Sequence, residues 1–316
     1  MRTTFVNSFI NLVESGQNVH LITADLGFRT FDPIRGKYPD RFTNVGVAEA
    51  NMIGIAAGMA MRGIRVFCYS IAPFVIFRTL DQIRADLCHM QLPVILVAAG
   101  GGLHYAFEGM THHAIEDIAI ARALPGMTVL APGDPLECEV LMKEVVNLNG
   151  PCYLRLGGNN NPLIYEQSQV PKFGEISCLQ SKGNIAIIAN GEMLLGAKKA
   201  MELLKKEGII CRLYSVHTLK PLDYLTIEKI ARECSCIITV EEHNIINGIG
   251  TAITEILFSC GYRGKFKKLG IPDEYAVKLG SKEWIRDRYG LGYMDIVGAI
   301  KSLLVGGAYY KDADFR

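Results

Sequence analysis

Short apolar runs alternate with helical patterns along most of the chain. In the first half, the runs that we expect to form strands are continuous in valine, isoleucine and leucine, and they are residues 19–25, 66–69, 93–99, 128–131 and 152–156. Strands that alternate apolar and polar residues have one face in water, whereas continuous apolar strands are typical of parallel sheets covered on both faces. The pattern therefore predicts buried parallel strands.

Helical patterns occupy the intervals between these runs. A helix is predicted from about residue 48, because Met52, Ile55 and Met59 lie on one stripe of its surface. Further helices are predicted over residues 77–90 and 135–148. Alternation of strands and helices indicates a parallel sheet with helices on both faces.

A break follows at residues 157–162, Gly-Gly-Asn-Asn-Asn-Pro, which is turn chemistry. The alternation then resumes with strands predicted at 185–189, 210–216 and 236–240 and helices at 191–207, 222–233 and 247–260. We therefore expect an α/β protein with two parallel-sheet α/β domains. They are residues 1–165 and a smaller domain at 184–316, joined by a linker at 166–183.

Composition narrows the class of partner. The chain has 316 residues, is 49% hydrophobic and carries a formal net charge of +1 with both signs scattered, so no basic stripe indicates nucleic acid or a membrane surface. Its nine cysteines mostly lie singly in apolar stretches and form no C-x-x-C pair, which favours buried thiols in a reducing compartment. No signal peptide or membrane-length apolar run is visible, so a cytoplasmic protein is expected.

The most informative stretch is residues 41–52, Arg-Phe-Thr-Asn-Val-Gly-Val-Ala-Glu-Ala-Asn-Met. Glu49 opens a helix of apolar and small residues. From the residues alone, an acid in a first turn is commonly a surface group that complements the helix dipole. Gly54 and Gly58 put small residues on the same helix, which permits close approach of another backbone, including one from another subunit.

The pattern R-F-x-N-V-G-x-A-E-x-N-M resembles the pyrimidine-domain signature of transketolases and 1-deoxyxylulose-5-phosphate synthases. The resemblance implies that Glu49 is catalytic and binds the aminopyrimidine of thiamine diphosphate at its N1′ nitrogen. A carboxyl in a water-poor setting binds a proton more tightly, which suits a proton shared with that ring. The cofactor would supply the carbon chemistry and the protein its orientation.

A second cluster is residues 108–117, Glu-Gly-Met-Thr-His-His-Ala-Ile-Glu-Asp. From the residues alone, Thr111 could cap a helix with the acids in its first turn. The segment resembles the family motif D-G-P-T-H-[QH]-x-x-E-D. That match implies that His112 is catalytic or binds the substrate, and that Glu108, in place of the usual aspartate, binds substrate. His104, in the Gly-rich loop just upstream, is a further candidate for substrate binding.

A third element spans residues 69–84 and contains Phe74 and Phe77. Aromatics at this spacing usually belong to the core. The segment resembles a family stretch ending R-x-x-D-Q-I-R, whose aromatics stack on the aminopyrimidine, and offset stacking contributes about 0.5–1.5 kcal/mol beyond burial. The resemblance implies cofactor binding by one of the two, with Phe74 preferred.

Two further positions match family motifs. Asp25 ends the first predicted strand, where α/β sheets place ligands, and matches an aspartate that lies near the cofactor. Arg155 matches P-x-Y-x-R, which implies that it binds the anionic end of a sugar. From the residues alone, an arginine at a strand end is often an ion-pair residue.

The Mg²⁺ and diphosphate motif of this cofactor class is missing. The chain has no Gly-Asp-Gly, and Asn159-Asn160-Asn161 lacks the acid that accompanies the asparagines in the family. We therefore expect no metal ligands on this chain. The resemblance implies that the diphosphate and Mg²⁺ are bound by an N-terminal-half transketolase subunit, in an α2β2 assembly.

The resemblance covers about residues 5–305, and residues 240–250 resemble the E-E-H-x-x-x-G-G-x-G stretch of the family's C-terminal domain. The expected function is the β subunit of a two-component thiamine-diphosphate-dependent transketolase, moving a two-carbon ketol unit between sugars or sugar phosphates. Alternatives are a 2-oxoacid dehydrogenase E1 β-like subunit, a deoxyxylulose-phosphate-synthase-like subunit, and a non-catalytic flavodoxin-like binding subunit. Arg155 and the Thr-His-His segment favour sugar chemistry, because E1 β chains usually have H-S-Q there.

Overall fold

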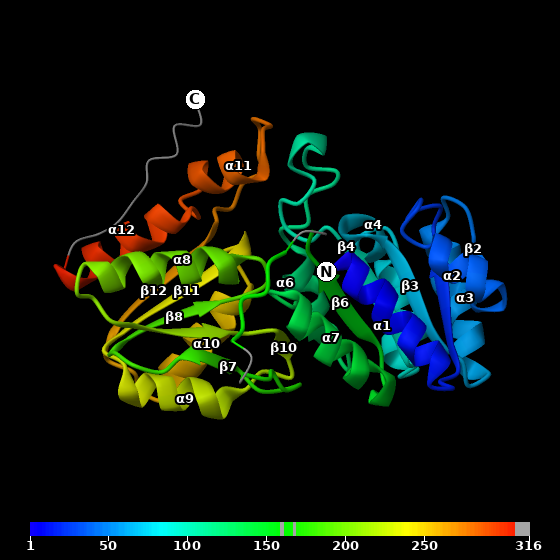
Figure 1. The fold of residues 1–316 in the computed structure, drawn as a ribbon, viewed down its shortest axis with the longest axis horizontal. Helices are drawn as coiled ribbons and strands as arrows, with labels where there is room; N and C mark the ends of the chain where they lie inside the picture. Colours follow the sequence, from blue (N-terminus) through cyan, green and yellow to red (C-terminus); the bar gives the residue numbers. More distant parts are fainter. Residues whose placement is uncertain (159–160, 167–168, 307–316) are drawn as a thin grey trace.

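The computed structural model describes residues 1–158, 161–166 and 169–306. These residues form two α/β lobes that lie side by side (Figure 1). The first lobe contains a seven-stranded sheet and the second a five-stranded sheet. This arrangement confirms the predicted α/β class, with one correction: each sheet is parallel except for a single antiparallel edge strand.

The sheet of the first lobe has the strand order β10-β5-β6-β4-β3-β1-β2. Its strands are β1 Val19–Thr23, β2 Phe42–Asn44, β3 Arg65–Ile71, β4 Val94–Ala99, β5 Thr128–Leu130, β6 Cys152–Leu156 and β10 Thr218–Lys220. The five strands predicted for this half are all present. β2 and β10, three residues each, were not predicted.

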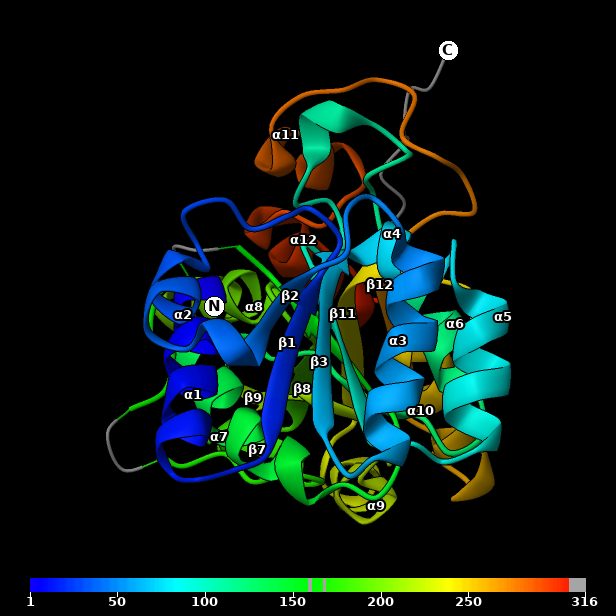
Figure 2. The ribbon, with the colours of Figure 1, turned by 90° about the vertical axis from the view of Figure 1, so that its right-hand side faces the viewer.

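Helices cover both faces of this sheet, as Figure 2 shows for α1 and α7 on one side and α3 and α6 on the other. The helices are α1 Arg2–Glu14, α2 Asp32–Lys37, α3 Glu49–Met61, α4 Ala72–Ile76, α5 Leu80–Gln82, α6 Asp117–Ala123 and α7 Pro135–Glu144. Successive residues of β1 enter different cores: Leu21 belongs to the one under α1 and α7, and Ile22 to the one under α3. Two covered faces explain why the strands are apolar at every position.

The prediction of a helix over residues 77–90 is wrong about where the helical structure begins. Helical structure begins at Ala72, with Pro73 in the first turn of α4, where its missing N–H costs nothing. After α5 the chain continues as a π-helical segment, Ile83–His89. Single-turn 3₁₀ segments complete this lobe at Pro39–Arg41, Ala106–Glu108 (η3) and Val145–Asn147.

The second lobe has the strand order β12-β11-β8-β9-β7. Its strands are β7 Ser177–Gln180, β8 Ile185–Ala189, β9 Cys211–Ser215, β11 Cys236–Asn244 and β12 Lys265–Ile271. Its helices are α8 Met193–Lys206, α9 Tyr224–Glu233, α10 Ile249–Ser259, α11 Lys282–Arg288 and α12 Tyr293–Leu304. β7 lies inside the segment 166–183, for which a linker was predicted.

The two lobes share a strand. β10 follows β9 in the second lobe but pairs antiparallel with β5, at the edge of the first sheet. The Ala131 amide donates to the His217 carbonyl over 2.8 Å, and the Lys220 ammonium donates to the carbonyls of Arg122 and Leu124. These bonds fix the second lobe against the first. No helix in the described ranges is long and apolar enough to cross a membrane.

Candidate active site

Glu49 is the first residue of α3, directly after the turn that follows β2. Its carboxyl is only 5% exposed, so the interpretation of Glu49 as a surface acid of a first helical turn is wrong. Ser70 Oγ, from β3, donates to Oε1 over 3.3 Å, and Arg78 Nη1 lies 3.3 Å from both carboxylate oxygens. A buried carboxylate requires such partners, because burying a charge without them is costly.

Arg78 also lies flat against a predicted cofactor residue. Its guanidinium carbon is 3.7 Å from the centroid of the Phe74 ring, four residues earlier on α4. Phe77 packs instead against the apolar core beneath α3. Of the two aromatic candidates, Phe74 is therefore the one that lies beside the partner of Glu49.

A series of ring contacts extends from Phe74 to both histidine candidates. The ring centroids are 5.0 Å apart for Phe74 and His112, 6.1 Å for His112 and Tyr105, and 5.0 Å for Tyr105 and His104. Glu49, Arg78, Phe74, His112, Tyr105 and His104 thus form one continuous cluster, which we call the ring cluster.

The loop that bears His104, Tyr105 and His112 is closed by a bridge between Gly102 and Ala114, and its η3 turn lies beside α11 of the second lobe (Figure 1). At Gly100 the backbone φ is +73°, and a Cβ there would be 2.2 Å from the Tyr105 ring, so glycine is required for the ring to lie as it does. The helix that Thr111 could cap is absent: the chain turns at Thr111, and α6 begins only at Asp117.

His104 is suited to contact a neutral polar ligand. Burial, with the nearby charge of Arg2, lowers the pKa of its imidazole, so the ring is neutral near pH 7. Its Nδ1 is buried and has no hydrogen-bond partner among the described residues. A buried nitrogen in this state gains free energy when a ligand supplies the missing bond.

Asp25 and Glu108 lie outside the ring cluster. Asp25 follows β1 with φ at +53°. Its backbone amide donates to Asn44 Oδ1, and Asn44 Nδ2 donates to its carboxylate, both over 2.9 Å. Glu108 is exposed at the end of η3. Within the described ranges, no hydrogen bond or ring contact joins either carboxylate to the ring cluster.

The surroundings of Arg155 favour an internal ion pair over the predicted contact with an anionic sugar end, and that contact stays a prediction. Arg155 is 6% exposed, and its Nε donates to Asp117 over 2.7 Å. Its Nη2 donates to Asp117, to the Ala114 carbonyl and to the Glu242 carbonyl. Burial alone would lower the pKa of Arg155, but the Asp117 carboxylate raises it, so the guanidinium is a permanent internal cation that links the two lobes.

A charged group from the second lobe lies near His104. Glu192 accepts hydrogen bonds from the Gly158 amide and from Lys282 Nζ, and Arg286 bridges Glu192 and Glu242. Burial alone would raise the pKa of Glu192, but Lys282 and Arg286 hold it well below its usual range. No sequence motif predicted that Glu192 and its charged partners lie near His104. The one signal available was the Glu-Glu-His run within β11, which indicated architecture only.

The known protein families that match this chain divide it into the same two parts as the two lobes. Residues 1–162 match the profile described as "Transketolase, pyrimidine binding domain", and residues 174–296 match "Transketolase, C-terminal domain". The chain belongs to the transketolase family. It is a transketolase-type subunit, which places Glu49 and the ring cluster in the pyrimidine-binding half of a transketolase.

Relatives of similar length exist. The chain is 31% identical over 299 residues to a subunit of the apulose-4-phosphate transketolase of Actinobacillus succinogenes, covering 94% of this chain and 96% of that one. It is 35% identical over 294 residues to "Putative transketolase C-terminal section" of Methanocaldococcus jannaschii, covering 92% of each. A solved structure entitled "Split gene transketolase, inactive beta4 tetramer" is similar with a TM-score of 0.86 and 30% identity, covering 96% of this chain and 97% of that one.

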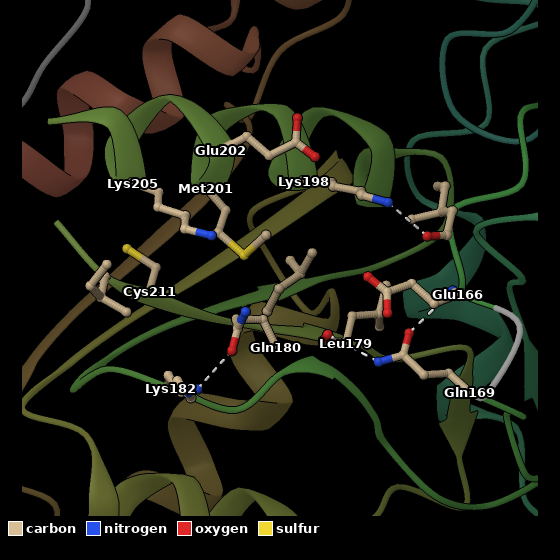
Figure 3. A pocket seen from close by; sticks show the side chains of 13 residues that line it. Glu166, Gln169, Leu179, Gln180, Lys182, Lys198, Met201, Glu202, Lys205 and Cys211 are labelled. Carbon is tan, nitrogen blue, oxygen red and sulfur yellow. Dashed lines mark hydrogen bonds between the residues drawn. The ribbon is translucent and has the colours of Figure 1, made fainter. Parts of the chain in front are cut away.

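This transketolase-type protein has a hollow of about 450 Å³, shown in Figure 3, and no residue of the ring cluster lines it. It opens between α8, β7 and β9, and Lys182, Lys198 and Lys205 are among its lining residues. The Lys198 ammonium already has a partner within the protein, because it donates to the Ile164 carbonyl over 2.8 Å. None of the predicted site residues lines this hollow.

Proposed function

We propose that the chain is the β subunit of a two-component, thiamine-diphosphate-dependent transketolase that transfers a two-carbon ketol unit between sugars. The observation that carries the proposal is that Glu49 and Phe74 contact one planar group from two sides, and we call the space that this group fills the slot. Arg78 fills it with a planar cation that contacts the carboxylate at 3.3 Å and the ring at 3.7 Å. An aminopyrimidine is also planar and needs the same two contacts, so the residues present fit this group.

When bound, the cofactor supplies a carbanion equivalent, which is chemistry that no side chain provides. The chain's own residues would orient it and manage protons. Glu49 would hold a proton at the ring nitrogen, Ser70 would fix the carboxyl, and Phe74 would stack on the ring. His112 and neutral His104 would contact sugar hydroxyls on the other side of Phe74.

A partner is part of the proposal. The chain lacks Gly-Asp-Gly, and within its described ranges no group of three or more His, Cys, Asp or Glu side chains is placed to hold a metal ion. Asn159 and Asn160 lie outside the described residues. We assign Mg²⁺ and diphosphate binding to an N-terminal-half subunit in an α2β2 assembly, with residues 1–165 and 184–316 as this chain's two functional units and 166–183 between them. Relatives named as a transketolase subunit and as a C-terminal section support this division.

The test is an assay of the chain with its partner against a panel of ketose phosphates and a panel of 2-oxoacids. We expect a ketose donor to yield an aldose shortened by two carbons, because a site with several hydroxyl contacts rejects substrates that leave them unpaired. Glu49→Gln should lower turnover about 10²–10⁴-fold, the usual contribution of general acid–base catalysis. Release of carbon dioxide from a 2-oxoacid, with no aldose from any ketose, would transfer the assignment to the E1 β-like alternative.

A further inference from the structure

Arg78 occupies the slot between Glu49 and Phe74 in a way that imitates a flat ligand. Its guanidinium is at once stacked against Phe74 at 3.7 Å and paired with both oxygens of Glu49 at 3.3 Å. The position four residues after Phe74 places both side chains on the same side of the helical segment. The aminopyrimidine of the proposed function needs those same two faces, so it and Arg78 cannot occupy them together.

The buried carboxylate explains why the slot is filled. Glu49 is 5% exposed, and its other partner is a neutral hydroxyl, Ser70 Oγ, at 3.3 Å. A buried carboxylate without a cation or several donors is strongly disfavoured. In the chain without cofactor, Arg78 supplies the missing positive charge.

The pair is nevertheless built to separate. The Arg78 side chain is 49% exposed, and its bonds of 3.3 Å are longer than the common range for N–H···O bonds. Arg155 shows the opposite design: its side chain is buried and bonded to Asp117 at 2.7 Å. A half-exposed ion pair contributes little to stability, so the Arg78 guanidinium can move into solvent at small cost once another group satisfies the Glu49 carboxylate.

We propose that Arg78 is a placeholder for the aminopyrimidine: in the free subunit it pairs with Glu49 and covers the Phe74 ring, and the pyrimidine ring displaces it. This inference rests on the proposed function. It adds that cofactor entry exchanges one planar partner of Glu49 for another. The affinity of the chain for the pyrimidine is therefore reduced by competition with a side chain of the same protein.

The experiment titrates the full chain with 4-amino-5-hydroxymethyl-2-methylpyrimidine, the pyrimidine half of the cofactor, and follows binding by NMR. Arg78→Ala should bind the probe about threefold to tenfold more tightly than the wild type, the range expected when a partly exposed ion pair and a cation–π contact no longer compete. Arg78→Lys keeps the charge without the planar fork and should fall between them. Arg62→Ala, at the other end of α3, removes the same charge and should bind like the wild type.

A second readout needs no substitution. The ¹⁵N resonances of Arg78 report how fast its guanidinium group rotates. We expect slow rotation in the free chain, where Glu49 and Phe74 hold the group, and rapid rotation once the probe is bound. Weaker binding by Arg78→Ala, or Arg78 resonances unchanged by the probe, would overturn the placeholder while leaving the pyrimidine site in place. Absence of probe binding by all four proteins up to the solubility limit would instead overturn the assignment of Glu49 and Phe74, and both proposals with it.

Discussion

At the scale of single residues, the surroundings of two arginines assign them opposite roles. Arg155 is enclosed by Asp117 and by carbonyls from both lobes, so its charge is fully used inside the protein. Arg78 has one acidic partner and a half-exposed side chain. Arg155, in β6, is therefore a fixed structural cation, whereas Arg78, after α4, is a displaceable one.

We predict that Arg155→Ala destabilises the fold. Removing one partner of a buried ion pair leaves the other, Asp117, unpaired at 0% exposure, which costs about 3–5 kcal/mol. Urea denaturation should show this loss in the free energy of unfolding. Lys143→Ala is the control, because its exposed pair with Glu139 is worth about 0.3–0.5 kcal/mol. Unchanged stability together with a raised KM for phosphorylated donors would restore Arg155 as an anion-binding residue.

The sequence contained enough to bring Glu49, Phe74 and His112 to one site, because each lies in a motif of its own. It could not predict that Arg78 lies between two of them, since R-x-x-D-Q-I-R does not specify a side-chain orientation. The burial of Arg155 depends on Asp117, 38 residues away along the chain. That contact exists only after β6 and α6 have packed together.

At the scale of elements, the predicted strands were those with continuous apolar residues, and the missed ones lack that signal. β12 has lysines at positions 265, 267 and 268 because it is an edge strand. β2 and β10 are three residues long and are defined by the strands beside them. The signal for α1 was present, since Phe5, Phe9 and Leu12 follow helical spacing and are buried.

Glu137, on α7, joins three elements and leads to a prediction about pH. It is fully buried and accepts hydrogen bonds from the Gly133 amide, from Ser215 Oγ at the end of β9 and from the Tyr165 hydroxyl. Burial raises the pKa of its carboxyl from 4.5 to about 7. The folded state therefore keeps a proton that the unfolded chain releases near pH 4.5, and the stability it contributes is lost as the pH rises through about 7.

The measurement is the free energy of unfolding of the wild type minus that of Glu137→Gln, as a function of pH. This difference should fall by up to about 3 kcal/mol from below pH 4.5 to above pH 7, at about 1.4 kcal/mol per pKa unit. The difference is needed because burial lowers the pKa of His217 and His243 to about 4, and these residues act in the opposite sense. Glu139→Gln, on the same helix but with an exposed side chain, is the control for the loss of a carboxyl charge from α7. A flat difference for Glu137 would contradict its raised pKa.

At the scale of the whole molecule, the second lobe is more than a support. Its β10 completes the first sheet, its Glu242 carbonyl holds Arg155, and its Glu192 accepts a hydrogen bond from Gly158 beside His104. The two lobes therefore form one side of a site. In the proposed function, this side supplies the pyrimidine contacts and the neutral polar groups of the site.

We therefore predict that the chain alone binds thiamine diphosphate with Mg²⁺ weakly and transfers no ketol unit. Mg²⁺ is held by carboxylate and phosphate oxygens, so a chain that binds only the pyrimidine forgoes the contacts that anchor the charged end of the cofactor. Calorimetric titration of the isolated chain should give a dissociation constant well above the micromolar range, and addition of an N-terminal-half subunit should bring tight binding and turnover together. Glu49→Gln provides the matched control, since it should still assemble with the partner while turnover falls about 10²–10⁴-fold. Micromolar or tighter binding by the isolated chain, accompanied by turnover, would show that this chain holds a complete site and would contradict the two-component assignment.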